Sequence, residues 1–162
     1  MSEKYKVIDN FLDKEEFIKL QDIFLSADVP YYFNKVVTFE DETTNNFMFT
    51  HTLYRHNVPN SDYFNEIVPI LEKLNIFALQ RAKINCYTRT ENLIVHAKHR
   101  DYEIKHKGAV YFFNTCNGKT IIENDSIDSV ENRIVLFDPS ILHASTNCTD
   151  EQARFTLNIN YM

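Results

Sequence analysis

Glycine is scarce in this sequence, where Gly108 and Gly118 are the only two among 162 residues. Phosphate-binding loops need closely spaced glycines, as in the GxxxxGK and GxGxxG patterns, so neither kind of nucleotide-binding loop is present. Cysteine is also rare: Cys86, Cys116 and Cys148 are odd in number and form no CxxC pair. This pattern argues against a disulfide framework or a zinc knuckle and favours a reducing compartment.

Long apolar runs and basic runs are absent as well. The first residues, Met1–Lys6, are followed by no apolar stretch of the length of a signal peptide or a membrane span. We therefore expect a soluble cytoplasmic protein with no membrane partner. No run of more than two adjacent Lys or Arg occurs, and the net charge is −6 with a pI near 5.5. A broad nucleic-acid-binding surface is therefore not expected; the oligomeric state stays open.

The hydrophobic and aromatic content, 44% and 14%, is typical of a folded chain with a real core. At this length we expect a single domain over residues 1–162. We divide it into a helical support with a variable region, about 1–76, and a β-rich core, about 77–162.

The first part of the chain predicts two helices. A capping box beginning at Asp13 and apolar residues at helical spacing predict a helix that runs to about Ser26. A second helix is expected to begin at a Ser61 cap, and Pro69 either kinks it or marks its true first turn. Between them, the region 29–56 is irregular and contains a polar loop at 40–46.

After residue 75 the apolar pattern changes from helical spacing to alternation. Asn117-Gly118 predicts a hairpin turn between two of the short strands that follow. Strands this short, placed after helices, predict an antiparallel double-stranded β-helix (a jelly roll or cupin-like fold) with helices packed on its major sheet. The predicted strands are 81–87, 108–114, 119–123, 133–137 and 153–161.

His99 and Asp101 lie two residues apart, so on an extended strand both side chains point to the same face. An imidazole and a carboxylate placed in this way supply two ligands of an iron(II) site if a second His joins them, and His143 is our candidate. Taken alone, His-x-Asp is a common pattern, and a surface turn capped by Asp101 explains it as well. His-Arg-Asp also opens the protein-kinase catalytic loop, but a kinase needs a Gly-rich loop, an Asp-Phe-Gly motif and a longer chain.

The last strand strengthens the metal-site interpretation. Arg154 follows His143 by eleven residues and shares one strand face with Thr156. A guanidinium makes a planar, two-pronged contact with a carboxylate, and the threonine adds a hydroxyl. The polar face of this strand either lies in water or lines a pocket inside a barrel. The strand Arg81–Tyr87, with Asn85 on its polar face, is divided in the same way, and this favours the pocket.

Together these motifs resemble the iron(II)- and 2-oxoglutarate-dependent oxygenases, in their prolyl-4-hydroxylase-like branch. The resemblance covers most of the chain, is weakest between about residues 29 and 56, and is greatest to short stand-alone forms in bacteria and their viruses. Its motif residues are His99-x-Asp101, His143 and Arg154-x-Thr156, and the similar segments are Val7–Leu12, Lys83–Tyr87 and Val110–Asn114.

The resemblance implies a role for each motif residue and a reaction. The implied iron(II) ligands are His99, Asp101 and His143, and the implied residues that bind 2-oxoglutarate are Arg154 (also in the catalytic set), Thr156, Tyr87 and Asn85. The reaction would consume O2 and 2-oxoglutarate, with ascorbate as a candidate reductant, and release succinate and CO2. It would hydroxylate an unactivated C–H bond of a peptidyl residue such as proline or of a small metabolite.

The sequence departs from the family pattern at two places, and two other functions are alternatives to this interpretation. Phe112 stands where many relatives carry Tyr, which removes a hydroxyl contact to the cosubstrate, and the usual paired glycine is reduced to Asn117-Gly118. A nucleobase demethylase on the same fold is disfavoured by the acidic net charge. A cupin-like module that binds a metal or ligand without turnover is disfavoured by the Arg154-x-Thr156 pair, for which it has no need.

The remaining histidines receive weaker predictions. His96 lies three residues before His99, at odd parity, so we expect it to face away from the site, structural or exposed. His106 is expected in a solvated loop. Four residues of the variable region are candidate substrate contacts: His51, Tyr54, Arg55 and His56.

Overall fold

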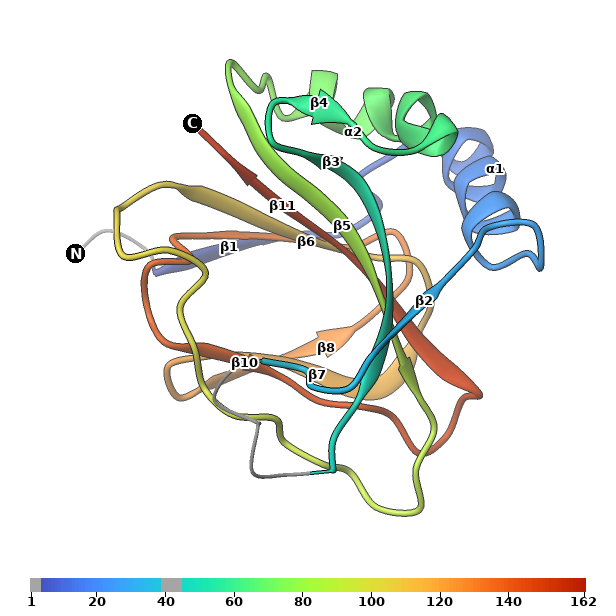
Figure 1. Ribbon diagram of the computed structural model, residues 1–162, viewed down its shortest axis with the longest axis vertical. Coiled ribbons are helices and arrows are strands. Elements are labelled where there is room, and N and C mark those ends of the chain that lie inside the picture. Colours follow the sequence, from blue (N-terminus) through green and yellow to red (C-terminus); the bar gives the residue numbers. More distant parts are fainter. Residues whose placement is uncertain (1–3, 39–44) are drawn as a thin grey trace.

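The computed structural model describes residues 4–38 and 45–162, so part of the polar loop expected at 40–46 lies outside the described residues. Strands dominate the structure and two helices lie early in the chain (Figure 1). The elements are β1 Tyr5–Ile8, α1 Lys14–Phe24, β2 Tyr32–Asn34, β3 Met48–Arg55, β4 Val58–Pro59, the 3-10 helix η2 Asp62–Ile67, α2 Val68–Lys73, β5 Leu79–Thr88, β6 Lys107–Phe112, β7 Cys116–Ile122, β8 Asp125–Ser129, β9 Ile134–Phe137, β10 His143–Ser145 and β11 Ala153–Tyr161.

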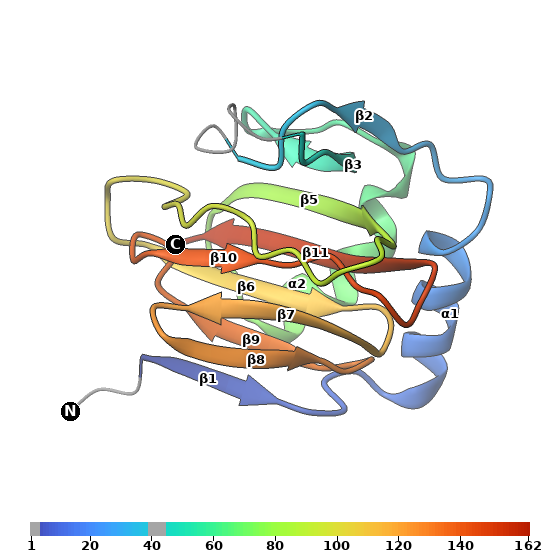
Figure 2. The same ribbon diagram turned by 90° about the horizontal axis from the view of Figure 1, so that it is seen from below.

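The strands form two antiparallel sheets that face each other. The major sheet has the order β1-β9-β6-β11-β5-β3-β2, with β4 paired to β3, and the minor sheet has the order β10-β7-β8. Figure 2 shows β7, β8 and β10 lying over β6, β9 and β11, and Figure 1 shows α1 and α2 on the other side of the major sheet. The predicted double-stranded β-helix with helices on the major sheet is confirmed.

The helices begin close to where the sequence predicts them. Asp13 is the N-cap of α1, but its side chain makes no capping hydrogen bond, so the expected capping box does not form. Ser61 caps η2 by accepting a hydrogen bond from the Tyr63 N–H. Pro69 lies in the first turn of α2, where its missing N–H costs nothing. Within 4–38 and 45–162, no helix combines the length and hydrophobicity that crossing a membrane requires.

Apolar and polar residues alternate along β5 and β11, so the apolar side chains lie on one face of the major sheet and the polar side chains on the other. Phe17, Leu20 and Phe24 of α1 are buried against the outer face, in one cluster with the apolar side chains of these strands. The opposite face points into the barrel. The members of the outer cluster on β5 and β11 are Leu79, Ala82, Ile84, Phe155, Leu157, Ile159 and Tyr161.

The barrel interior is apolar at one end and polar at the other. A second apolar cluster fills the space between β6 and β9 of the major sheet and β7 and β8 of the minor sheet, and its buried members are Val110, Phe112, Ile122, Ile127 and Val135. The end under β5 and β11 instead receives the polar side chains of those strands. A binding site can therefore form there without opening the core.

The predicted hairpin at Asn117-Gly118 is wrong. Both residues lie inside β7, at a register shift between Cys116 and Lys119. The chain turns earlier, after Phe112, and it passes from the major sheet to the minor sheet instead of pairing β6 with β7. The Asn-Gly pair signalled a local irregularity, but a long-range crossing decided the topology.

Candidate metal centre and its pocket

Two histidines and an aspartate meet where the segment after β5 passes the start of β10. His99 and His143 form an isolated antiparallel bridge, in which each backbone N–H donates to the other's carbonyl oxygen, at 2.9 and 3.0 Å. The Asp101 N–H donates to the Pro139 carbonyl oxygen at 3.0 Å. The strand expected at His99 and Asp101 is thus reduced to one bridge, and the segment 139–143 holds both residues in place.

The three side chains converge on one point. Their candidate ligand atoms all lie within 4.8 Å of one another. Asp101 Oδ1 is 3.8 Å from His99 Nε2 and 3.9 Å from His143 Nε2, and the two imidazole centroids are 4.4 Å apart. Two imidazoles and one carboxylate are the donor set typical of mononuclear iron(II), so these residues fit that metal.

Both imidazoles have the orientation that a metal ligand needs. His143 Nδ1 lies 2.9 Å from the Ile141 carbonyl oxygen, and His99 Nδ1 lies 3.3 Å from the Ala97 carbonyl oxygen. A ring that donates its Nδ1–H to a carbonyl keeps a lone pair on Nε2. Burial and the neighbouring His99 ring lower the pKa of His143, which favours the neutral, ligating form.

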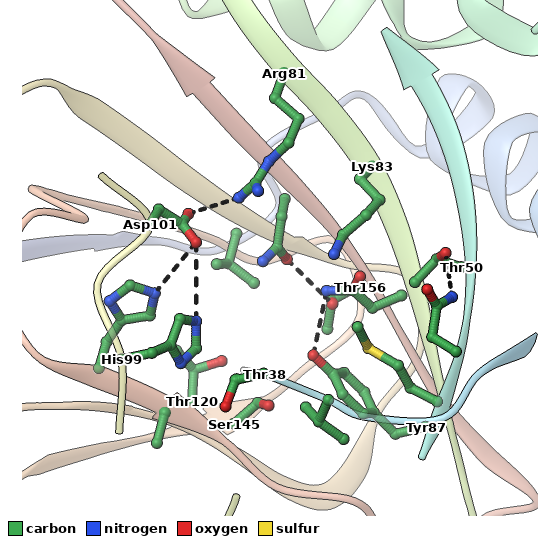
Figure 3. Close-up of a pocket in the computed structure, with 18 of the residues that line it drawn as sticks. Thr38, Thr50, Arg81, Lys83, Tyr87, His99, Asp101, Thr120, Ser145 and Thr156 are labelled. Carbon is green, nitrogen blue, oxygen red and sulfur yellow. Dashed lines mark hydrogen bonds and ion pairs between the residues drawn. The ribbon is translucent and has the colours of Figure 1, made fainter. Parts of the chain in front are cut away.

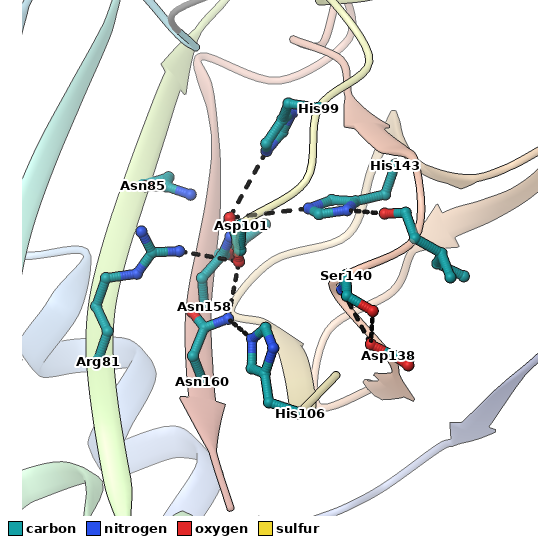
Figure 4. A network of polar contacts seen from close by, with 12 residues as sticks. Arg81, Asn85, His99, Asp101, His106, Asp138, Ser140, His143, Asn158 and Asn160 are labelled. Atoms are coloured by element: carbon teal, nitrogen blue, oxygen red, sulfur yellow. Dashed lines mark hydrogen bonds and ion pairs between the residues drawn. The ribbon is translucent and has the colours of Figure 1, made fainter. Parts of the chain in front are cut away.

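The second carboxylate oxygen of Asp101 is held by the protein (Figure 4). Asp101 Oδ2 accepts from Arg81 Nη2 at 2.9 Å and from Asn160 Nδ2 at 2.8 Å, and His106 Nε2 lies 3.1 Å from that same Asn160 nitrogen. Burial raises the pKa of Asp101, but the charge of Arg81, the His143 ring and the Asn160 hydrogen bond outweigh it and lower the pKa to about 2. Oδ1 therefore faces the imidazoles as an ionised oxygen.

A cavity of about 390 Å³ opens beside this group, between the two sheets (Figure 3). As predicted, the polar faces of the two central strands line it, with Arg81, Lys83, Asn85 and Tyr87 from β5 and Arg154, Thr156 and Asn158 from β11. The volume is typical of a site for a small molecule.

Arg154 lies at one end of this cavity and is only 1% exposed. Its Nε donates to Ser129 Oγ at 2.6 Å, Nη1 to the Thr146 carbonyl oxygen at 3.0 Å and Nη2 to Thr120 Oγ1 at 2.8 Å. All three partners are neutral, no described carboxylate forms an ion pair with Arg154, and each terminal nitrogen has a second N–H to donate. Because a buried cation without an anion is costly, this end of the cavity suits the carboxylate of a ligand.

The packing around Arg154 leaves its guanidinium little freedom. The rings of Tyr87 and Phe112 each lie 5.5 Å from the guanidinium carbon. Phe112 therefore supports the cation with its ring, although it cannot supply the hydroxyl contact that the resemblance implies for a Tyr here. Gly118 makes the close approach possible, since a Cβ there would lie 2.6 Å from the Asn147 carbonyl oxygen and closer still to Arg154 Cδ.

The other expected cosubstrate contacts occupy neighbouring positions of the paired strands. Thr156 lies opposite Asn85 and Arg154 opposite Tyr87 in the register of β11 with β5. The Tyr87 hydroxyl accepts from Asn85 Nδ2 at 3.2 Å, and Asn85 Oδ1 has no hydrogen-bond partner among the described residues. Burial raises the pKa of Tyr87, so its hydroxyl keeps a proton to donate. The Thr156 hydroxyl donates to Asn158 Oδ1 at 3.3 Å.

Two histidines near the site have structural roles. His96 is outside the metal-ligand group, as predicted; it is buried, its ring stacks 5.4 Å from that of Tyr87, and its Nδ1 lies 2.9 Å from Ser145 Oγ. The solvated position expected for His106 is wrong, because His106 is 7% exposed and contacts Asn160. No local pattern indicates this contact, because His106 and Asn160 are 54 positions apart in the chain.

Of the four candidate substrate contacts in the variable region, Arg55 lines the cavity and the others do not. His51 is buried, with Nδ1 at 2.7 Å from the Pro30 carbonyl oxygen and Nε2 at 2.6 Å from Ser61 Oγ. Tyr54 packs against the outer core, and His56 is exposed outside the cavity. Along β3, Thr50 and Thr52 face the cavity and His51 faces away from it. A register shift between Thr52 and Tyr54 then reverses the alternation, so that Tyr54 faces the outer core and Arg55 lines the cavity.

The three cysteines, distant in sequence, include two that are close in space. Cys116, Cys148 and Asp150 have candidate ligand atoms within 4.8 Å of one another, and all three thiols of the chain are free. Burial raises the pKa of Cys86 to about 12 and that of Cys148 to about 11. The Cys86 and Cys148 thiols are therefore protonated at neutral pH.

The fold is shared with solved oxygenase structures, whereas no protein-family model and no curated protein matches the sequence. A 2OG-Fe(II) oxygenase-family oxidoreductase from Burkholderia pseudomallei superposes with a TM-score of 0.71 at 10% identity, over 98% of this chain and 84% of that one. The viral collagen prolyl hydroxylase of Paramecium bursaria Chlorella virus 1, in complex with 2OG, gives 0.63 at 12%, over 98% and 95%. The α-ketoglutarate-dependent epimerase SnoN of nogalamycin biosynthesis gives 0.66 at 12%, over 98% and 78%. At such identities the likeness establishes the fold, which is that of the 2-oxoglutarate- and iron(II)-dependent oxygenases.

Proposed function

We propose that this chain is an iron(II)- and 2-oxoglutarate-dependent dioxygenase that hydroxylates an unactivated C–H bond. The observation that carries the proposal is the pairing of two features in one cavity. At one side lies a two-histidine, one-carboxylate group, and at another lies the buried Arg154 with no described carboxylate to neutralise it. A dicarboxylic 2-oxo acid satisfies both, because one end suits a metal and the other suits the guanidinium.

In this proposal His99, His143 and Asp101 hold iron(II) through their Nε2 atoms and Oδ1. Arg81 and Asn160 occupy Oδ2 of Asp101, which leaves one oxygen of the carboxylate to the metal. Iron(II), when bound, would supply the chemistry by which 2-oxoglutarate and O2 give succinate and CO2. The second oxygen atom of O2 would be inserted into a C–H bond of the substrate.

The residues at the Arg154 end bind and orient the cosubstrate. Arg154 supplies its two remaining N–H groups to the distal carboxylate, and Thr156 and Tyr87 supply hydroxyls. The three hydrogen bonds that Arg154 already makes hold the guanidinium plane, so little side-chain entropy is lost on binding. The Asn85 amide donates to the Tyr87 hydroxyl and orients it, and Asn85 Oδ1 is left to accept.

The substrate is a peptidyl residue such as proline or a small metabolite. The viral neighbour is named for hydroxylating prolyl residues of collagen and SnoN for an epimerisation in nogalamycin biosynthesis, so both substrate types occur on this fold. A rival that binds metal or ligand without turnover has no use for a dicarboxylate clamp.

Oxygen-dependent succinate formation tests the reaction class. The metal-free protein is reconstituted anaerobically with iron(II), 2-oxoglutarate and ascorbate and is then exposed to O2. We expect succinate from the wild-type protein and loss of it in His99→Ala, which removes a metal ligand, and in Arg154→Ala, which removes the cation for the distal carboxylate. Lys35→Met, at an exposed residue outside the cavity, is the control and should keep wild-type turnover.

Unchanged turnover in both His99→Ala and Arg154→Ala would refute the site assignment. Stoichiometric binding of iron and 2-oxoglutarate with no succinate in any condition would favour the non-catalytic binding module. A nucleobase demethylase would bind single-stranded DNA at low salt, where phosphate contacts are strongest, and a titration under those conditions decides that case.

A further inference from the structure

The cavity contains more positive charge than its metal and cosubstrate account for. Its lining includes four arginines and one lysine but a single described acid, Asp101. Asp101 is already paired with Arg81 at 2.9 Å, and 2-oxoglutarate would neutralise Arg154. Arg100 is exposed and solvated. Arg55 is exposed as well, at the mouth of the cavity, so Lys83 is the partly buried cation that pairs with no acid of the described residues.

Lys83 is the unusual member of this set. It is partly buried on β5, between Arg81 and Asn85 on the face that points into the barrel, and it forms no hydrogen bond or ion pair with any described residue. Most lysines of a protein keep the ammonium in water. Burial and the charges of Arg81 and Arg55 lower the pKa of Lys83 to about 8. The fold thus keeps the Lys83 ammonium partly buried in the cavity, which costs free energy as long as no anion neutralises it.

Other polar atoms around Lys83 also lack partners. Arg81 Nε and Asn85 Oδ1, which flank Lys83 two residues away along β5, are buried, line the cavity and have no hydrogen-bond partner among the described residues. Thr52 lies opposite Lys83 in the register of β3 with β5. Buried polar groups in native proteins are almost always paired, so this group of unsatisfied atoms indicates a polar ligand.

This region is distinct from the one assigned to 2-oxoglutarate. Along β5, Lys83 lies four residues from Tyr87, about 13 Å at the rise of a strand, and Tyr87 is the residue opposite Arg154. In Figure 3 the side chains of Arg81 and Lys83 lie on the side of the cavity away from Thr120 and Ser145. Thr120 accepts a hydrogen bond from Arg154, so it marks the Arg154 side of the cavity. The Lys83 side is therefore free for a substrate when the Arg154 side holds the cosubstrate.

We propose that the substrate carries an anionic group, a carboxylate or a phosphate, which Lys83 binds inside the cavity and Arg55 attracts at its mouth. The inference rests on the proposed function, since it assigns the second ligand of the same site. It narrows the substrate to an acid. A substrate without such a group would leave the Lys83 ammonium buried and unpaired.

Binding of matched charged and neutral probes tests the inference without turnover. The protein is loaded with zinc(II) in place of iron(II) and saturated with 2-oxoglutarate, so that Arg154 is occupied and no reaction occurs. Ligand-observed NMR then measures the dissociation constants of N-acetylated amino acids, of the corresponding amides, and of inorganic phosphate. We expect each acid to bind at least about tenfold more tightly than its amide, as one charge-assisted hydrogen bond supplies.

Three variants identify the residue responsible. Lys83→Met should abolish the preference for acid over amide, Lys83→Arg should keep it, and Lys35→Met should keep it despite the same change in net charge. If phosphate binds more tightly than the acids and also depends on Lys83, the anionic group is a phosphate; if the acids bind more tightly, it is a carboxylate.

Two results would overturn the inference. One is an equal affinity of the wild-type protein for acid and amide, or a preference that survives in Lys83→Met. The other is a Lys83→Met variant whose affinity for 2-oxoglutarate itself falls tenfold, because Lys83 would then serve the cosubstrate. Failure of the proposed function is a separate outcome, seen when wild-type protein binds no 2-oxoglutarate in the first step of the same experiment.

Discussion

Replacing Gly118 by alanine should disable the cosubstrate clamp from outside it. The new Cβ would lie 2.6 Å from the Asn147 carbonyl oxygen and closer still to Arg154 Cδ. Neither obstacle can move cheaply, because the first is backbone and the second belongs to a fully buried side chain held by three hydrogen bonds. Overpacking of this kind costs about 1–3 kcal/mol of stability.

The same clash should weaken 2-oxoglutarate binding selectively. A guanidinium displaced from its plane loses charge-assisted hydrogen bonds to the distal carboxylate, each worth about 1.5–3 kcal/mol, so we expect affinity to fall roughly tenfold to a hundredfold. Isothermal titration of the zinc-loaded protein measures this for 2-oxoglutarate and for 2-oxovalerate, which lacks the distal carboxylate. The preference for the dicarboxylate over the monocarboxylate should shrink in Gly118→Ala.

Gly108→Ala is the matched control for overpacking: its Cβ would meet the Pro139 ring at 2.7 Å, beside the segment that holds Asp101 and not beside Arg154, so any loss of binding should be equal for the two 2-oxo acids. It should lower the free energy of unfolding in urea and leave the preference for the dicarboxylate unchanged. A Gly118→Ala protein with wild-type stability and wild-type preference would refute the packing described around Arg154.

Three further predictions concern the metal site, the core and the thiols. Asn160→Leu removes a hydrogen bond to Asp101 Oδ2 and should weaken metal binding about tenfold in a competition titration with a chelator; unchanged affinity would show that Arg81 alone orients the carboxylate. Leu157→Ala empties a fully buried position of the outer core and should cost about 2–5 kcal/mol in urea unfolding, with no change in the preference for dicarboxylate in the folded protein. Burial raises the pKa of Cys148 to about 11 from the ordinary 9.0, so the ultraviolet thiolate absorbance of the native protein, taken as the difference from Cys148→Ser, should still be rising at about pH 10. An inflection near pH 9, as in unfolded protein, would contradict the raised pKa.

Local patterns in the sequence predicted the parts of the site that depend on alternation. The polar faces of β5 and β11 line the cavity because a strand places every second side chain on the same side. The same rule separated His99 from His96 and would have separated Thr50 from His51. Arg81 and Lys83 were visible on the polar face from the start, but no pattern gave them a role.

Long-range contacts account for what the sequence did not predict. Asn117-Gly118 has the composition of a hairpin turn, yet the chain crosses between sheets and the glycine is needed for Arg154 instead. His106 lies in an irregular segment, yet Asn160 of the last strand brings it into the network around Asp101. Neither partner can be found without knowing which strands become neighbours.

The most direct test of the central claim is the visible absorption spectrum of the anaerobic protein with iron(II) and 2-oxoglutarate. If His99, Asp101 and His143 hold iron(II) and Arg154 directs 2-oxoglutarate onto it, a weak charge-transfer band should appear on addition of both, and it should be absent in His99→Ala. The band should need far more 2-oxoglutarate in Arg154→Ala. A wild-type protein that binds iron(II) and 2-oxoglutarate without this band, or a band that persists in His99→Ala, would contradict the account.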